Sequence, residues 1–181
     1  MREEVYMAGM GGQGVLLASQ ILAQAAMSAG LEVSWVPLYS PEVRGGRATC
    51  TVVVADGEVG SPVVGHPAVM ILMDRIAVEN HLGKIRPAGL AIVNSSLTGE
   101  EFDRDDVRII AIPANDVATE VGSERTVNMV LLGAYVASAE LVTLADIEQA
   151  LREVIPERHH SFIPINVAAL QRGAQYVTNH R

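Results

Sequence analysis

The sequence predicts an α/β fold: a three-layer sandwich with a mostly parallel but mixed sheet and a helical C-terminal third. Three observations support this class. A glycine-rich turn joins two apolar runs near the N-terminus, strand and helix patterns alternate as far as about residue 112, and the chain is mainly helical from Asn115 onward. Alternating strands and helices are typical of a largely parallel sheet covered by helices.

The strands follow from short runs of β-branched and other apolar residues. Thr51-Val52-Val53-Val54 is strongly β-prone. Asp56-Gly57 predicts a hairpin-type turn with a short return at 58–59, which would make the sheet mixed at this point. The predicted strands cover about 4–8, 31–36, 47–55, 68–73, 89–93 and 107–112.

The helices follow from apolar spacing and from capping residues. Gly30 stands where a C-cap glycine is expected, and Thr143 is a suitable N-cap. The helix predicted at about 126–139 is apolar on nearly every face, so it is buried in the fold or covered by another chain. The predicted helices run from the glycine turn to about Ser28 and over about 75–82, 117–121, 126–139, 144–154 and 165–178, with a loop at 37–46.

Composition limits the classes of function. We expect one domain, 1–181, and the net charge of −8 argues against nucleic acid or an anionic membrane as the main partner. Lys84 is the only lysine, which rules out a Walker A site, and Cys50 as the only cysteine cannot build a disulfide, zinc or iron–sulfur site within the chain. With no signal-peptide core and no apolar run of about 18 residues, we expect a cytoplasmic protein with no membrane partner.

The glycine-rich turn carries the strongest functional signal. Gly9, Gly11 and Gly14 match the dinucleotide fingerprint G-x-G-x-x-G in spacing and in its position between a strand and a helix, so the domain is Rossmann-like. Backbone N–H groups and the positive end of a helix dipole meet at such a turn and attract phosphate. Gln13, inside the turn, either hydrogen-bonds a ligand or caps the helix.

The fingerprint lacks its usual partner. A nicotinamide or flavin site carries an acid about 20 residues further on, at the end of the second strand, to hold the ribose hydroxyls. Here the second predicted strand ends in Pro37-Leu38-Tyr39, and its one acid, Glu32, lies near its start. The sequence therefore indicates a phosphate site without a ribose site.

A second loop, 39–46, is predicted to lie beside the glycine turn, because both follow strands at the carboxyl end of the sheet. Arg44 in this loop could clamp a phosphate or carboxylate with two hydrogen bonds, or form a solvated ion pair in a surface turn. Asn128, within the apolar helix, must find an internal partner or point to an interface.

No catalytic machinery is evident. Ser40 lacks a credible histidine partner, and Cys50 is read as a small core residue. His159-His160 has no third ligand at a suitable spacing and is read as a solvated helix start. The residues alone therefore predict an α/β domain that binds phosphate, and they do not indicate a reaction.

The ordered set of motifs resembles the gamma subunit of 2-oxoacid:ferredoxin (acceptor) oxidoreductases over almost the whole chain. The matching segments are Gly9-Met10-Gly11-Gly12-Gln13-Gly14-Val15, Ser40-Pro41-Glu42-Val43-Arg44-Gly45-Gly46, Cys50-Thr51-Val52-Val53, Ser61-Pro62, Ile92-Val93-Asn94-Ser95-Ser96, Ile112-Pro113-Ala114 and Asn128-Met129-Val130-Leu131-Leu132-Gly133-Ala134.

This resemblance implies a subunit that is inactive alone. Alpha and beta subunits, with or without a delta subunit, would carry thiamine diphosphate and iron–sulfur clusters, decarboxylate the 2-oxoacid to an acyl-CoA, and pass electrons to ferredoxin or flavodoxin. The gamma chain would bind coenzyme A phosphates through Gly9, Gly11, Gly12, Gln13 and Gly14, with Ser40, Glu42 and Arg44 as the neighbouring wall and Asn128 in the same cleft or at an interface.

The substrate is expected to be 2-oxoglutarate, since a short separate gamma chain containing Pro41-Glu42-Val43-Arg44-Gly45-Gly46 looks most like that type. The alternatives are the pyruvate or branched-chain version of the complex, or a stand-alone nucleotide- or flavin-binding oxidoreductase.

Overall fold

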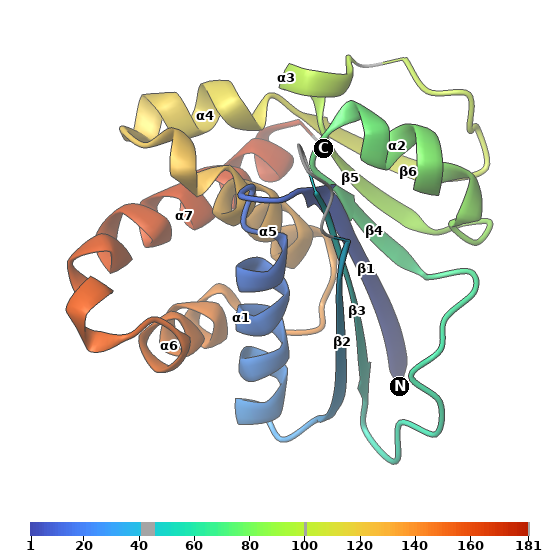
Figure 1. Ribbon diagram of the computed structural model, residues 1–181, viewed down its shortest axis with the longest axis horizontal. Coiled ribbons are helices and arrows are strands. Elements are labelled where there is room, and N and C mark those ends of the chain that lie inside the picture. The colour runs from blue at the N-terminus through green and yellow to red at the C-terminus, as the bar shows by residue number, and fades with distance from the viewer. Residues whose placement is uncertain (41–45, 100, 181) are drawn as a thin grey trace.

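The computed structural model describes residues 1–40, 46–99 and 101–180 and contains a six-stranded mixed sheet (Figure 1). The strand order is β2-β3-β1-β4-β5-β6, and β3 runs antiparallel to both of its neighbours while the other pairs, from β1 to β6, are parallel. The strands are β1 (Arg2–Met10), β2 (Glu32–Ser40), β3 (Arg47–Ala55), β4 (Val69–Leu72), β5 (Leu90–Asn94) and β6 (Arg108–Ile112).

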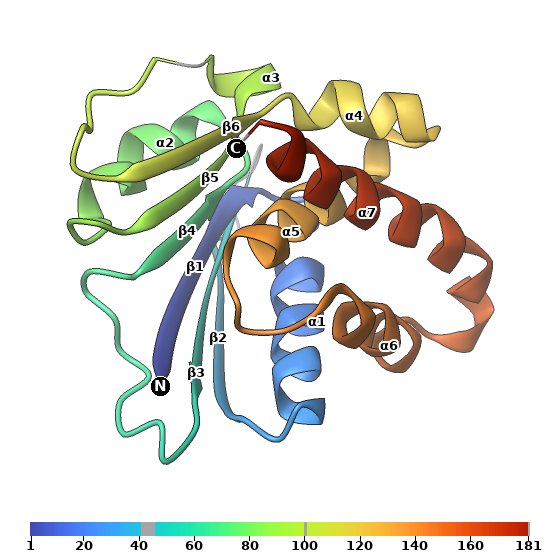
Figure 2. The same ribbon diagram turned by 180° about the vertical axis from the view of Figure 1, so that it is seen from behind.

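Helices cover both faces of this sheet. In Figures 1 and 2, α1, α5, α6 and α7 lie on one side of the strands, and α2 lies on the other side. The helices are α1 (Val15–Ser28), α2 (Arg75–His81), α3 (Ser95–Thr98), α4 (Ala114–Val121), α5 (Val127–Ser138), α6 (Leu144–Val154) and α7 (Ile163–Asn179), and the 3-10 turns are η1 (Leu82–Lys84), η2 (Glu124–Thr126) and η3 (Glu157–Phe162). The three-layer α/β class with a helical C-terminal third is confirmed.

Two apolar clusters fill the spaces between the layers. The larger lies between the sheet and α1, α5, α6 and α7, and the smaller lies under α2 and η1. Side chains of β1 point alternately into the two clusters: Val5 and Met7 face α1, and Ala8 faces α2. β1 is therefore buried on both faces and paired at both edges.

Helix α5 is the most enclosed helix of the larger cluster. Its residues from Val127 to Val136 are all buried. It crosses α7 at a very close approach, because a Cβ atom at Gly133 would lie 1.9 Å from the Leu170 carbonyl oxygen, and one at Gly173 would lie 1.9 Å from the Val130 carbonyl oxygen. Of the two possibilities for this apolar helix, burial within its own chain is the one observed.

Two local predictions are corrected. The hairpin at Asp56-Gly57 is wrong: residues 58–59 form no strand, and β3 pairs instead with β1 and β2. The loop predicted from Pro37 is also wrong at its start, because β2 continues through Pro37 to Ser40. A proline is tolerated there since β2 is an edge strand. The predicted strand 47–55 and the helix from residue 144 to 154 are confirmed.

The order of the strands determines where a site can form. After β1 the chain passes through α1 to β2, on one side of the sheet, and it later returns to β4 on the other side of β1. The carboxyl ends of β1 and β4 therefore lie at a topological switch point, where open α/β sheets bind ligands. No helix in the described part of the chain is both long and apolar enough to cross a membrane.

Candidate functional site

The glycine turn lies at this switch point and exposes backbone donors. Residues 11–14 connect the end of β1 to α1, and Gly12 and Gly14 have positive φ angles of 93° and 79°. In the described part of the chain, the N–H groups of Gly12 and Gly14 have no hydrogen-bond partner, and no side chain caps α1. A Cβ atom on Gly12 would meet open space. An anion can therefore approach the N-terminus of α1 directly.

Gln13 holds the turn closed. Its side-chain Oε1 accepts a hydrogen bond from the Met10 N–H at 2.6 Å, and its own N–H donates to the Met10 carbonyl at 3.1 Å. A Cβ on Gly9 would come within 2.6 Å of that Oε1 atom. Gln13 thus bonds back to the strand and does not cap α1, its role toward a ligand stays a prediction, and Gly9 leaves the space for its side chain.

Asn128 supports the turn from below. Its side chain is 3% exposed, its Nδ2 donates to the Gly14 carbonyl at 3.2 Å, and its Oδ1 accepts from the Met129 N–H at 3.0 Å. A Cβ on Gly14 would lie 2.4 Å from Nδ2. Of the alternatives for Asn128, an internal partner is the one observed, and the amide positions Gly14; its place in a binding cleft or at an interface stays a prediction.

The end of β2 lies against the same turn. A Cβ on Gly11 would lie 3.3 Å from the Tyr39 hydroxyl, and one on Gly46 would lie 2.9 Å from it. The Gly11 N–H donates to the Gly46 carbonyl at 2.6 Å. Ser40 is exposed at the end of the strand, opposite Arg47. Glu42 and Arg44 lie outside the described residues.

Arg47 and Asp74 form a two-point ion pair beside the turn. The guanidinium donates to both carboxylate oxygens, at 3.1 and 2.9 Å, and the two side chains are 20% and 14% exposed. Asp74 also caps α2 by accepting from the Ala77 N–H at 2.9 Å. The pair therefore joins β3, which begins directly after Gly46, to the helix that follows β4.

A buried asparagine joins the next strand ends. The Nδ2 of Asn94 donates to the Met73 carbonyl at 3.1 Å and to the Asn115 Oδ1 at 2.8 Å. Its Oδ1 accepts from the Ala114 N–H at 3.2 Å. The ends of β4, β5 and β6 are thus fixed to one another, which makes this edge of the sheet a rigid platform under the glycine turn.

The arrangement supplies binding groups and no reactive pair. Cys50 is buried, and this burial raises its pKa to about 11, so the thiolate needed for nucleophilic attack is disfavoured. No group of three or more metal-ligating side chains occurs in the described part of the chain. His159 and His160 lie in η3, and His159 lines a hollow of about 330 Å³ together with Leu17 in the first turn of α1 and Thr126 before α5.

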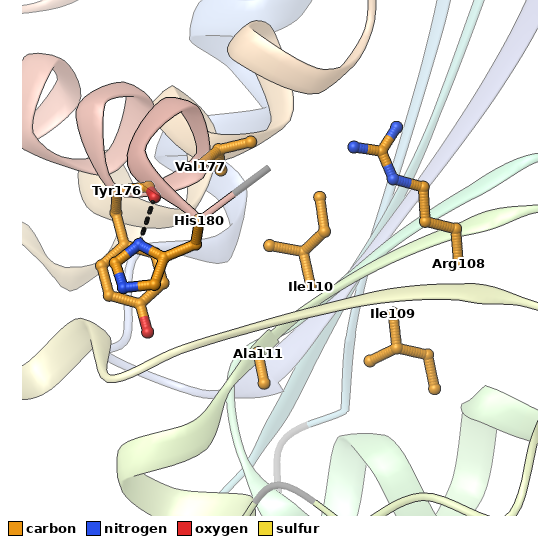
Figure 3. Close-up of a pocket in the computed structure, with 7 residues that line it drawn as sticks. All are labelled: Arg108, Ile109, Ile110, Ala111, Tyr176, Val177 and His180. Carbon is orange, nitrogen blue, oxygen red and sulfur yellow. Dashed lines mark hydrogen bonds between the residues drawn. The ribbon is translucent and has the colours of Figure 1, made fainter.

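Besides the hollow that Leu17 and His159 line beside the start of α1, others lie elsewhere on the surface. One of about 660 Å³ lies between the edge strand β6 and the end of α7, where the Tyr176 and His180 rings stack with centroids 4.2 Å apart (Figure 3). His180 Nδ1 donates to the Tyr176 carbonyl at 2.7 Å. Figure 3 shows Ile110 directed toward α7 while Arg108 lies at the far end of the strand from the ring pair. Among the described residues that line this hollow, none is a carboxylate that could act as an acid or base together with His180.

Sequence reasoning missed Tyr39, Arg47, Asp74 and the bracing role of Asn94. The signal available for Asp74 was its position directly after a buried strand and before a helix, as an N-cap. Arg47 gave no local signal, because its partner is known only once β3 is placed beside β1.

Comparisons with known proteins agree with this geometry. The family model of pyruvate ferredoxin/flavodoxin oxidoreductase matches residues 4–176. The ketoisovalerate oxidoreductase subunit VorA of Methanothermobacter marburgensis is 35% identical over 95% of this chain, and the chain spans only 36% of the length of that relative.

Two further comparisons extend over whole chains. The 2-oxoglutarate synthase subunit KorC of the same organism is 30% identical, with 98% of this chain and 97% of the relative covered. The crystal structure of a keto/oxoacid ferredoxin oxidoreductase gamma subunit from Geobacter sulfurreducens has a TM-score of 0.83 at 27% identity, covering 98% of this chain and 99% of that one.

Proposed function

The chain belongs to the pyruvate ferredoxin/flavodoxin oxidoreductase family, as a chain of the gamma-subunit type, and on this premise we propose that it binds the phosphates of coenzyme A within a multi-subunit 2-oxoacid:ferredoxin oxidoreductase. The observation that carries the proposal is the open glycine turn at the N-terminus of α1. The unpaired N–H groups of Gly12 and Gly14 suit a pyrophosphate, and the absence of an acid at the end of β2 suits a ligand other than a dinucleotide.

The sheet order supports the same choice of ligand. In a dinucleotide site, the strand after the first helix lies next to the first strand, so that its end reaches the ribose. Here β3 separates β2 from β1, which displaces the end of β2 by one strand. A stand-alone nicotinamide or flavin enzyme is therefore the less suitable assignment.

Within the proposal, this chain holds and orients the acyl acceptor and makes subunit contacts. Thiamine diphosphate and iron–sulfur clusters, held by alpha and beta subunits with or without a delta subunit, would supply decarboxylation and electron transfer to ferredoxin or flavodoxin. Ser40, Glu42 and Arg44 are proposed as the wall beside the turn. The proposed location of the complex is the cytoplasm, and the chain is proposed to act as one domain.

We propose 2-oxoglutarate as the substrate of the complex. The 2-oxoglutarate synthase subunit KorC is matched over 97% of its length, as a separate short chain. The higher identity to VorA favours a branched-chain 2-oxoacid as the second candidate. Acyl-CoA formation by the native complex with each 2-oxoacid distinguishes the two, and a higher kcat/KM for 2-oxoisovalerate would overturn the first choice.

The coenzyme A site is tested with a matched pair of glycine variants. Gly12 and Gly30 both have positive φ and both would place a Cβ in open space, so Gly12→Ala and Gly30→Ala introduce comparable backbone strain, about 1–2 kcal/mol each. Only the methyl group at position 12 stands where a phosphate would approach. We expect Gly12→Ala to raise the KM for coenzyme A about tenfold or more in the assembled complex, at unchanged 2-oxoacid KM.

The control defines what would contradict the assignment. Gly30→Ala is expected to leave the KM for coenzyme A unchanged, at a similar loss of thermal stability. If the two variants have the same KM for coenzyme A, the phosphates bind elsewhere. Decarboxylation of the 2-oxoacid without coenzyme A, measured as CO2 release, should continue in both variants.

A further inference from the structure

A small pocket on the α2 side of the sheet contains polar groups that coenzyme A binding at the glycine turn does not use. It has a volume of about 150 Å³ and lies between β1, β4, the end of α2, η1 and the segment 64–67. Tyr6, His81 and Lys84 provide its polar groups, and Val64, Pro67 and Met70 provide apolar wall. We call it the Tyr6–His81–Lys84 pocket.

The pocket places one cation, Lys84, in an acidic chain. Lys84 is the sole lysine of a chain with net charge −8, and its ammonium forms no ion pair with a carboxylate in the ranges 1–40, 46–99 and 101–180. The backbone carbonyls nearby already have donors. His66 donates to the Lys84 carbonyl at 3.1 Å, and Arg104 donates to the Leu82 and Ile85 carbonyls at 3.0 and 3.2 Å. Lys84 is therefore not needed to cap these carbonyls.

Tyr6 and His81 form a polar pair at the pocket. The Tyr6 hydroxyl lies 3.4 Å from His81 Nδ1, and the ring centroids are 5.0 Å apart. Burial lowers the pKa of His81, and the charges of Lys84 and Arg47 lower it further. An entering negative charge would instead favour protonation of the His81 ring, which would add a second cation next to Lys84.

We propose that the Tyr6–His81–Lys84 pocket binds one oxyanion of phosphate size through the Lys84 ammonium, the His81 ring and the Tyr6 hydroxyl. A charged acceptor that receives such hydrogen bonds is held more tightly than a neutral one. The pocket is distinct from the glycine turn, since Tyr6 and Met10 are four residues apart on β1, or about 13 Å. The proposal therefore does not depend on the coenzyme A assignment.

The test follows the His81 ring by NMR while the full chain is titrated with sodium sulfate at constant ionic strength. Sulfate keeps its charge from pH 6 to 8, so only the protein titrates. We expect a saturable shift of the His81 ring signals and tighter binding at pH 6 than at pH 8, because binding takes up a proton. The charged and titratable groups that face His81 are Tyr6 on β1, Arg47 on β3, Asp74 before α2 and Lys84 on η1.

Variants separate a specific site from general electrostatics. Lys84→Met and Arg75→Gln each remove one positive charge, and Arg75 lies exposed at the start of α2 in a pair with Glu79. We expect Lys84→Met to raise the Kd for sulfate at least about tenfold and Arg75→Gln to leave it unchanged. Tyr6→Phe removes one hydrogen-bond donor and should raise the Kd about threefold. A linear, unsaturable shift, or equal Kd values for Lys84→Met and Arg75→Gln, would overturn the proposal.

A competition experiment identifies which phosphate compound the pocket binds. Inorganic phosphate and the 3′-phosphate of coenzyme A share the chemistry that this pocket recognises. Displacement of sulfate from His81 by coenzyme A but not by dephospho-coenzyme A supports the pocket as a site for the 3′-phosphate. Displacement by inorganic phosphate alone supports a free-anion site. If neither coenzyme A nor inorganic phosphate displaces sulfate, the proposal that the pocket binds an oxyanion of phosphate size is contradicted.

Discussion

At the scale of single residues, the glycine turn is shaped by hydrogen bonds from neighbouring side chains and backbone groups. Asn128 bonds the Gly14 carbonyl from below, Gln13 bonds Met10, and the Gly46 carbonyl accepts from Gly11. Each contact fixes a backbone group and leaves the N–H groups of Gly12 and Gly14 free in the described part of the chain. Preorganised donors of this kind bind an anion without a cost of ordering the loop on binding.

The Arg47–Asp74 pair gives a prediction at this scale. Both side chains are mostly buried, so removing one partner leaves the other charge poorly solvated. We expect Arg47→Gln and Asp74→Asn each to lower the free energy of unfolding by about 1–3 kcal/mol in urea denaturation, with the double variant losing less than the sum. Arg75→Gln, in an exposed pair, should change stability little. Strict additivity of the two single changes would show that the pair contributes no coupling.

Local sequence patterns predicted part of this detail. The glycine spacing placed the turn at residues 9–14 because φ and close-approach requirements are local. Arg47 reaches Asp74, and Tyr39 reaches the glycine turn, only because β3 lies between β1 and β2, and that pairing is a long-range property. Asn128 was singled out correctly as a polar residue needing a partner, but its partner lies 114 residues earlier in the chain.

At the scale of elements, α5 and α7 show how two glycines permit a close helix crossing. Their backbones approach at Gly133 and Gly173, where each glycine faces a carbonyl of the other helix. Alanine favours an isolated helix by about 1 kcal/mol over glycine, so the two glycines are kept for packing.

The close crossing of α5 and α7 predicts whether Gly133→Ala raises or lowers the free energy of unfolding. A Cβ at position 133 would lie 1.9 Å from the Leu170 carbonyl oxygen, which is backbone and cannot rotate away. We expect Gly133→Ala to lower the free energy of unfolding by about 2–3 kcal/mol despite its helix propensity. Gly83→Ala, in η1, meets nothing within 4 Å and should be neutral or slightly stabilising. A stabilised Gly133→Ala protein in thermal or urea unfolding would contradict the observed crossing.

Element boundaries were predictable where caps are local. Thr143 and Asp146 form a complete capping box, which is why the start of α6 was evident. The ends of β1 and β2 were predicted too short, because residues such as Pro37 and Leu38 are extended only through pairing with β3. The false hairpin at Asp56-Gly57 has the same cause: the turn residues are present, but the partner of β3 is elsewhere.

At the scale of the whole molecule, two helical layers cover the sheet, and the glycine turn lies at the carboxyl end of β1. The fold class was predictable because the alternation of strands and helices along the chain is the same for any order of the strands in the sheet. The insertion of the antiparallel β3 next to β1 was not, because no local pattern distinguishes it from an insertion at the sheet edge.

The assembly itself gives the prediction at this scale. Because the described part of the chain holds no metal-ligating cluster and its cysteine is buried with a raised pKa, we expect the isolated chain to show no 2-oxoacid-dependent reduction of ferredoxin or of an artificial dye. Addition of the partner subunits should restore turnover, and affinity purification from the native host should recover those larger chains. Turnover by the isolated, homogeneous chain would contradict the subunit assignment.

The position of β1 has a consequence for biosynthesis. β1 precedes the other five strands in the chain, and both strands that flank it in the sheet, β3 and β4, are synthesised after it. One edge of β1 can pair once β3 has emerged, but its other edge stays unpaired until residues through Leu72 have emerged. Pausing or truncation before that point would yield an aggregation-prone fragment, and chaperone engagement should concentrate in this window.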